Sequence, residues 1–210
     1  MLGHDIIVIG GSAGSISALV QLVQGFPPDL PAAVFVVVHT SPHFPSLLPE
    51  ILQRSGSLPA VHAEDGASIE PGRIYVAPPD HHLLLKREYM GVVFGPKENR
   101  FRPAIDPLFR TAALAYGKRV VGIVLSGLLY DGTAGLIEIK QRGGMVIVQD
   151  PQEAALPSMP QSAIKHVAVD HILSSVDMAR VLFELSHQPV QYTSCINAGM
   201  PPKSPNSGGL

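Results

Sequence analysis

The chain has 210 residues, 46% of them hydrophobic and 15% charged, which predicts one folded domain with a substantial core. Its net charge of −2 gives no general attraction to nucleic acid or to an anionic membrane, and it has neither a secretory signal pattern nor an apolar run long enough to span a bilayer. Cys195 is the single cysteine, so an internal disulfide and a thiolate metal cluster are excluded. We expect a cytoplasmic protein with no nucleic-acid partner and no membrane insertion.

The first predicted strand and helix meet at a short polar turn. An apolar β-branched run at 6–9 ends in two glycines, Ser12 follows, and an amphipathic helix is expected at 16–23. This order places Ser12 at the carboxyl edge of a sheet, where ligands of open α/β folds bind. It also places Ser12 at the amino end of a helix, whose free N–H groups stabilise an oxyanion or a phosphate.

The next segments contain one more clear strand and then a change of pattern. A buried strand is expected at 33–38 and ends at His39, and a helix is expected at 46–54. The region 59–95 has short apolar pieces separated by proline-rich and polar turns. This pattern predicts strands and hairpins with at least one antiparallel pair.

The second half of the chain alternates strands with helices. Asp106 is the expected N-cap of a helix that runs to Tyr116, with Pro107 at its first position. The later elements are expected as strands at 120–125 and 145–149 and helices at 133–142, 160–166 and 176–185. Alternating strands and helices predict parallel pairing with helices on both faces.

These elements predict an α/β fold with a doubly wound, mostly parallel sheet, helices on both faces and a short antiparallel or hairpin excursion at about 59–95. The expected folded domain covers residues 1–187. Residues 188–210 are rich in Pro, Ser, Asn and Gly and have no period, so a disordered tail is expected there.

Three polar residues follow three of the predicted core strands. They are Ser12, His39 and Asp131, and the carboxyl ends of parallel strands share one edge of a sheet. A serine hydroxyl becomes a nucleophile when a base removes its proton, a histidine can act as that base, and a carboxylate holds the imidazole in place. Taken singly, each has a structural alternative: a helix cap for Ser12, a buried histidine for His39 and a turn residue for Asp131.

Two other kinds of site are weaker alternatives. A dinucleotide fingerprint requires Gly-x-Gly-x-x-Gly, and Ser12 and Ser15 stand at its second and third glycine positions, with His39 where an acidic residue is expected. A metal site could be built from His39, His43 and the Asp80-His81-His82 run. The sequence has no His-Glu-x-x-His pattern, however, and adjacent histidines on a strand point to opposite sides.

Several motifs in one order resemble the catalytic domain of the chemotaxis receptor methylesterase family (CheB, protein-glutamate methylesterase) from about residue 5 to 185. The matching stretches are 9–15 (Ile-Gly-Gly-Ser-Ala-Gly-Ser), 38–39 with Phe44 beyond, Glu64-Asp65-Gly66, 71–78 (Pro-Gly-Arg-Ile-Tyr-Val-Ala-Pro), 99–109 (Asn-Arg-Phe-Arg-Pro-Ala-Ile-Asp-Pro-Leu-Phe) and 124–132 (Val-Leu-Ser-Gly-Leu-Leu-Tyr-Asp-Gly). Matched by position, the resemblance places the catalytic residues of the family on Ser12, His39 and Asp131.

The resemblance implies hydrolysis of glutamate methyl esters on chemoreceptors, with deamidation of glutamines as a second activity, and requires no metal or cofactor. It implies an oxyanion site made by backbone N–H groups near Ala13 and Leu128. Arg100 and Arg102 are candidates to face an acidic receptor surface, and the alternative for them is a solvated loop or a structural ion pair.

The sequence departs from the family pattern at Ala13, where threonine is usual, and at Leu128-Leu129, where Met-Gly is usual. Leucine at 129 matters if that position needs a positive φ. The receiver domain that usually precedes the family's catalytic domain has no counterpart before the first strand. We therefore expect an enzyme that is always active, that is controlled by a separate partner such as a response regulator or a methyltransferase, or that serves a receptor-like system outside chemotaxis. A catalytically impaired binding module is the alternative.

Overall fold

A sheet of seven parallel strands forms the centre of the computed structural model, which describes residues 3–42 and 44–190. In spatial order the strands are β3 (Ala60–His62), β4 (Arg73–Val76), β2 (Ala33–Val38), β1 (Ile6–Gly11), β7 (Val120–Val124), β8 (Met145–Gln149) and β9 (His171–Leu173). Every neighbouring pair in this sheet is parallel. The expected parallel sheet is confirmed.

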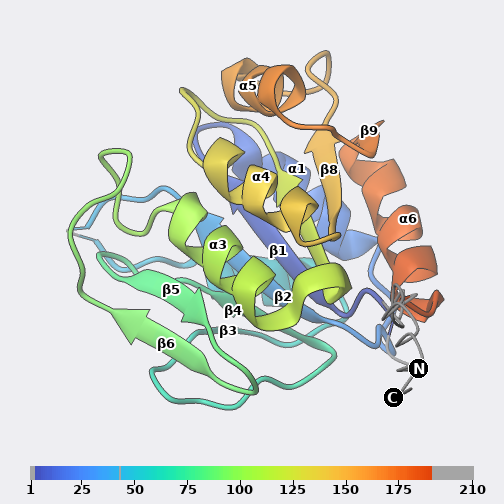
Figure 1. The fold of residues 1–210 in the computed structure, drawn as a ribbon. Coiled ribbons are helices and arrows are strands. Elements are labelled where there is room, and N and C mark those ends of the chain that lie inside the picture. The colour runs from blue at the N-terminus through green and yellow to red at the C-terminus, as the bar shows by residue number, and fades with distance from the viewer. Residues whose placement is uncertain (1–2, 43, 191–210) are drawn as a thin grey trace, which may run out of the picture.

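Helices cover both faces of the sheet (Figure 1). On one face lie α1 (Ser15–Gln24), α2 (Leu48–Ser55) and α6 (Ser175–His187). On the other lie α3 (Ile105–Tyr116), α4 (Thr133–Gln141) and α5 (Ser158–His166), with the short 3-10 helix η1 (Gly117–Arg119) after α3. Each layer buries its own apolar cluster against the sheet, so the doubly wound architecture is confirmed.

Strand β1 lies where the chain reverses its direction of winding. Its two neighbours are β2 and β7, and all six of its residues are buried. A Cβ on Gly10 would come within 2.4 Å of Cγ2 of Ile105, so glycine allows the first turn of α3 to lie directly over the sheet. Because ligands of such sheets bind where the winding reverses, the carboxyl end of β1 is the expected binding crevice.

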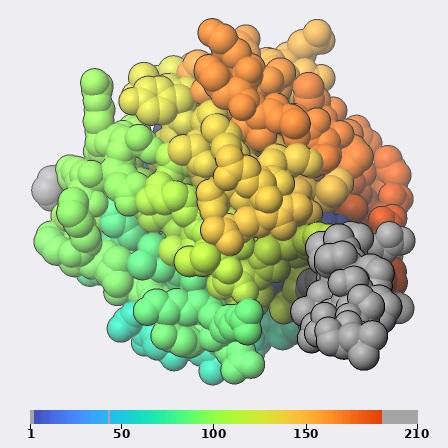
Figure 2. All heavy atoms as spheres, in the orientation of Figure 1, coloured from blue at the N-terminus to red at the C-terminus, as the bar shows by residue number. Residues whose placement is uncertain are grey.

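The antiparallel excursion is smaller than the sequence indicated. It consists of β5 (His82–Leu85) and β6 (Met90–Val93), which pair with each other and bury their apolar face in the cluster under α3. The other two strands of the 59–95 region, β3 and β4, instead join the edge of the parallel sheet. In the space-filling view helices α3 and α4 cover the middle of the sheet on this face (Figure 2).

The remaining differences from the sequence-based expectation are local. Strand β9 was not predicted, because it has three residues and none of them is buried. The predicted disordered tail lies outside the described residues from position 191 onward. Within the described ranges, no helix has both the length and the apolar character needed to cross a bilayer.

Candidate active site

Ser12 lies in the turn between β1 and α1, and the backbone holds this turn on both sides. Its N–H donates to the carbonyl of Ser126 at 2.9 Å, and its carbonyl accepts from Oγ of Ser15 at 2.7 Å. The N-cap of α1 is Gly14, with φ 77°, and no side chain caps the helix. The cap interpretation of Ser12 is therefore wrong, and its hydroxyl is available for other contacts.

His39 connects Ser12 to Asp131. Its Nδ1 lies 3.0 Å from Oγ of Ser12, its Nε2 lies 2.7 Å from Oδ2 of Asp131, and its side chain is 4% exposed. The carboxylate can only accept a hydrogen bond, so the network assigns the ring proton to Nε2. Nδ1 then faces the hydroxyl of Ser12 with a free lone pair. The structure thus brings together the three residues that the sequence analysis placed at one sheet edge.

Asp131 is held by donors at both carboxylate oxygens. The contacts are His39 Nε2 (2.7 Å) and the N–H of Ile105 (2.7 Å) at Oδ2, and Asn99 Nδ2 (2.7 Å) and the N–H groups of Asp106 (3.2 Å) and Gly132 (3.0 Å) at Oδ1. Two of these donors are backbone groups at the amino end of α3, where a negative charge is favoured. Burial acts to raise the pKa of Asp131, but these hydrogen bonds outweigh it and the pKa lies below its ordinary value.

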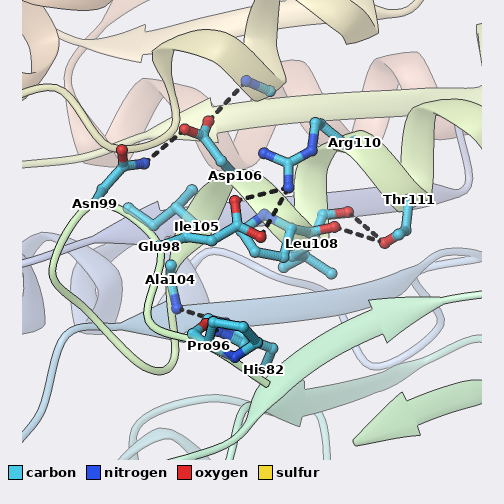
Figure 3. Close-up of polar contacts among 12 residues, drawn as sticks. His82, Pro96, Glu98, Asn99, Ala104, Ile105, Asp106, Leu108, Arg110 and Thr111 are labelled. Carbon is cyan, nitrogen blue, oxygen red and sulfur yellow. Dashed lines mark hydrogen bonds and ion pairs between the residues drawn. The ribbon is translucent and has the colours of Figure 1, made fainter. Parts of the chain in front are cut away.

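Asp106 is not the helix cap that the sequence suggested. Helix α3 begins at Ile105 with Ala104 as its N-cap, so Asp106 lies inside the first turn. Oδ1 of Asp106 accepts from the N–H of Gly135 on α4 at 2.7 Å. Its Oδ2 accepts from Nδ2 of Asn99 at 2.8 Å (Figure 3). Burial raises the pKa of Asp106, and the nearby carboxylate of Asp131 raises it further.

Phe101 is a site residue that the sequence analysis did not single out. Its ring is stacked on the ring of His39, with centroids 3.6 Å apart and planes at 8°. This contact restricts rotation of the imidazole. The sequence signal was only its position inside the 99–109 motif, in a loop whose path the sequence does not give.

The expected oxyanion residues lie beside Ser12. A Cβ on Gly127 would come within 2.8 Å of Cβ of Ser12, so the loop that carries Leu128 passes close to the hydroxyl. Among the described residues, no protein acceptor contacts the N–H of Ala13 or of Leu128. Leu129 has φ 68°, so the position does need the left-handed conformation that leucine disfavours.

The two candidate arginines differ. Arg102 donates to Oδ1 of Asp80 at 2.7 and 2.9 Å and to the carbonyl of Gly95 at 2.6 Å, and its guanidinium lies 3.6 Å from the ring centroid of Phe94. It is a structural ion pair, which was the alternative interpretation. Arg100 is exposed, with φ 76°.

Two of the histidines considered for a metal site, His81 and His82, have backbone partners. Nδ1 of His81 bonds the carbonyl of Pro79 at 3.1 Å, and Nε2 of His82 bonds that of Pro96 at 2.8 Å. Across the described ranges, no group of three or more His, Cys, Asp or Glu side chains has an arrangement that could hold a metal ion. His43 lies outside the described residues.

Comparison with known proteins places this site in a family. The profile of the CheB methylesterase family matches residues 7–182. A Leptospira interrogans protein provisionally named protein-glutamate methylesterase/protein-glutamine glutaminase is 34% identical over 90% of this chain and 99% of its own length. An Anaeromyxobacter dehalogenans protein-glutamate methylesterase/protein-glutamine glutaminase is 36% identical over 87% of this chain, which spans 53% of that protein.

A solved structure agrees with these sequence relatives. The crystal structure of the Thermotoga maritima CheB methylesterase catalytic domain superposes with a TM-score of 0.84 and 34% identity, covering 86% of this chain and 98% of that one. The family profile covers most of the folded region, and the fold and the relatives point the same way. The chain therefore belongs to the CheB methylesterase family, a family of carboxylic ester hydrolases.

Proposed function

We propose that this chain is a serine esterase that hydrolyses glutamate methyl esters on chemoreceptor-type signalling proteins, with glutamine deamidation as a second activity. The observation that carries the proposal is the continuous line from Oγ of Ser12 through the ring of His39 to Oδ2 of Asp131. The names of the family relatives support the substrate class.

In the first half of the reaction, Nδ1 of His39 takes the proton of Ser12 while Oγ attacks the ester carbonyl. Asp131 stabilises the imidazolium that forms. The free N–H groups of Ala13 and Leu128 are the candidate donors to the oxyanion, and one such donor typically lowers the barrier by about 3 kcal/mol. His39 then returns the proton to the methoxide, and methanol leaves an acyl-enzyme on Ser12.

In the second half, Nδ1 of His39 takes a proton from water, and the resulting hydroxide attacks the acyl carbonyl. Collapse of the tetrahedral species releases the free glutamate side chain, and the proton returns to Oγ of Ser12. A glutamine substrate follows the same two steps with ammonia as the leaving group. No step in this scheme requires a metal or a cofactor.

The surface around the line supports a protein substrate. A hollow lined by Thr40, the residue after His39, includes the exposed side chains of Phe44 and Leu47. In the loop that leads to Asp131, Leu128 and Tyr130 are also exposed. A methylated receptor segment with apolar residues next to the ester could contact these exposed side chains.

The proposed controlling partner is a separate response regulator or methyltransferase.

Methanol release from methylated receptor fragments tests the proposal. The parent should release methanol and the Ser12→Ala variant should release none, because no other nucleophile lies on the line. A Ser55→Ala variant provides the control, since its hydroxyl is exposed and bonds only the carbonyl of Ile51 in its own helix. Equal release by the parent and the Ser12→Ala variant would contradict the proposal.

A folded parent that releases no methanol would favour the impaired binding module. The observation behind this second candidate is the leucine at position 129, whose φ of 68° strains the loop that carries the N–H of Leu128. Binding of the methylated fragment without turnover would identify that case.

A further inference from the structure

The hydrogen-bonded line that begins at Ser12 does not end at Asp131. The side-chain nitrogen of Asn99 lies between two carboxylates, 2.7 Å from Oδ1 of Asp131 and 2.8 Å from Oδ2 of Asp106. Figure 3 shows Asn99 directed toward Asp106, which projects from the first turn of α3. Neither Asn99 nor Asp106 has a part in the mechanism above.

The orientation of the Asn99 amide follows from its partners. An amide oxygen placed there would face two acceptors, whereas the NH2 group offers one hydrogen to each carboxylate. Both hydrogens of the amide are therefore used. The backbone of Asn99 has φ 49°, a conformation that asparagine tolerates better than most residues.

The contacts of Asp106 indicate a charged carboxylate. Its two oxygens accept from the N–H of Gly135 at 2.7 Å and from Asn99, so a protonated Asp106 would point its hydroxyl at a donor. Only 4% of the residue is exposed to solvent. Two buried negative charges thus share one nitrogen as their donor.

The charged groups around Asp106 come from several elements. Asp131 lies in the β7–α4 loop, and Arg110 lies one helical turn further along α3. His39 follows β2 and contacts the other oxygen of Asp131. The guanidinium of Arg110 is bonded to Glu98 at 2.7 and 3.0 Å, so part of its charge is already compensated. From α4 the partner is the uncharged N–H of Gly135.

We propose that Asn99 and Asp106 are positioning residues for the candidate catalytic line, in which the Asn99 amide fixes Asp131 and the buried Asp106 carboxylate holds the Asn99 amide in place. This inference rests on the proposed function. Asn99 acts directly on the line, because it holds the oxygen of Asp131 that His39 does not use. Asp106 acts one contact further out, because it accepts the second hydrogen of the same NH2 group.

The test uses inactivation by a fluorophosphonate, which phosphonylates an activated serine and needs no receptor. Asn99→Ala should slow inactivation about tenfold, because Asp131 loses a donor at Oδ1. In an Asp131→Ala background the same change should have little further effect, because Asn99 acts through Asp131. A merely structural role would give the same loss in both backgrounds.

Asp106→Asn tests the second residue and keeps the size of the side chain. The new amide has one acceptor oxygen for the two donors that the carboxylate holds, so Asn99 is held less firmly and inactivation should slow about threefold. Glu138→Gln is the matched control, because it removes a carboxylate on α4 that pairs with Arg142. Its inactivation rate should match that of the parent.

Each outcome decides the inference. An Asn99→Ala or Asp106→Asn variant that reacts as fast as the parent, or an equal loss from Asn99→Ala with and without Asp131, would overturn it. A parent that the reagent modifies but that releases no methanol from methylated fragments would overturn the proposed substrate and leave this inference standing. A parent that the reagent does not modify at any pH would overturn both.

Discussion

The loop between β7 and α4 has two adjacent parts with opposite physical character. Leu128, Leu129 and Tyr130 are 50%, 44% and 59% exposed, and Leu129 has a strained backbone. Asp131, the next residue, is 1% exposed and accepts hydrogen bonds at both oxygens. Asp131, which orients the base, is therefore fixed by many contacts, whereas the exposed residues 128–130, which carry the candidate oxyanion donor, have few.

The buried part should be the more sensitive to a small chemical change. Asp131→Asn leaves one acceptor oxygen. Three N–H donors meet Oδ1, so the oxygen stays there, the NH2 group replaces Oδ2, and Nε2 of His39 loses its acceptor. We expect kcat for methyl ester hydrolysis to fall about 10⁴-fold, with a lower Tm.

The matched control for that change is Asp150→Asn. Asp150 follows β8 at the same edge of the sheet, but its Oδ1 accepts from the N–H of Gln152 at 2.8 Å, outside the line. Its kcat should stay near that of the parent. A similar loss in both variants would mean that the position of Asp131 in the line has no special effect.

The stacked ring on His39 gives the next largest effect. Phe101→Ala removes the contact that restricts the imidazole, and we expect kcat to fall about 10- to 100-fold with a smaller change in KM. Phe94→Ala is the control, because Phe94 is exposed and stacks on Arg102 in the same part of the chain. An unchanged kcat in Phe101→Ala would show that the hydrogen bonds alone orient His39.

In the exposed part of the β7–α4 loop, replacing one residue by glycine should increase the free energy of unfolding. Leu129→Gly relieves a left-handed backbone that costs leucine about 1–2 kcal/mol, against about 0.5–1 kcal/mol of added chain entropy in the unfolded state. We expect the free energy of unfolding to rise by about 0.5–1 kcal/mol in urea titration.

Leu128→Gly is the control for that stabilisation. Leu128 is similarly exposed but does not have a positive φ. Glycine there should lower the free energy of unfolding by about 0.5–1 kcal/mol. If both glycine variants change the free energy of unfolding in the same direction, the backbone at Leu129 is not strained.

Acid should act first at the amino edge of the sheet, far along β1 from the site. Burial lowers the pKa of His4 from 6.5, against opposing effects of Asp5, Asp170 and a hydrogen bond with the Lys118 backbone, and within the described residues its Nδ1 has no partner. The unfolded chain therefore binds more protons below pH 6.5, and stability is lost as the pH falls from there toward the folded pKa.

The carboxylates of the site titrate in other ways. Asp131 has a lowered pKa, so its contribution is present above 3.8 and is lost only as the pH falls through the folded value. Asp106 has a raised pKa, so above pH 3.8 the folded chain binds more protons than the unfolded chain, and the stability from this group is lost as the pH rises through the folded value. His4→Gln leaves both unchanged and should reduce the loss of Tm between pH 7 and 5, whereas His166→Gln, an exposed histidine, should not.

Much of the fold could be predicted because buried strands carry a simple signal. The strand at 145–149 was predicted with the bounds of β8, and the convergence of Ser12 and His39 followed from parallel strands sharing an edge. β9 was missed because a short strand with no buried residue has no such signal. The contribution of β3 and β4 to the parallel sheet was also missed, since short strands in a turn-rich segment do not reveal their partners.

The site beyond the three strand ends could not be predicted, for a physical reason. Asp106 has the sequence context of an N-cap, but its partner is the N–H of Gly135, which only the packing of α3 on α4 brings near. Asn99 and Phe101 reach Asp131 and His39 through a loop that returns from the hairpin. Such contacts depend on the path of the loop rather than on local pattern.

The central claim is that His39, held by Asp131, activates Ser12. The most direct measurement is the rate at which a fluorophosphonate labels the parent and His39→Gln, with the labelled residue mapped by mass spectrometry. The account predicts a single label on Ser12 and a rate at least about 10³-fold lower in His39→Gln. Equal rates in the two proteins, or a label on another serine, would contradict it.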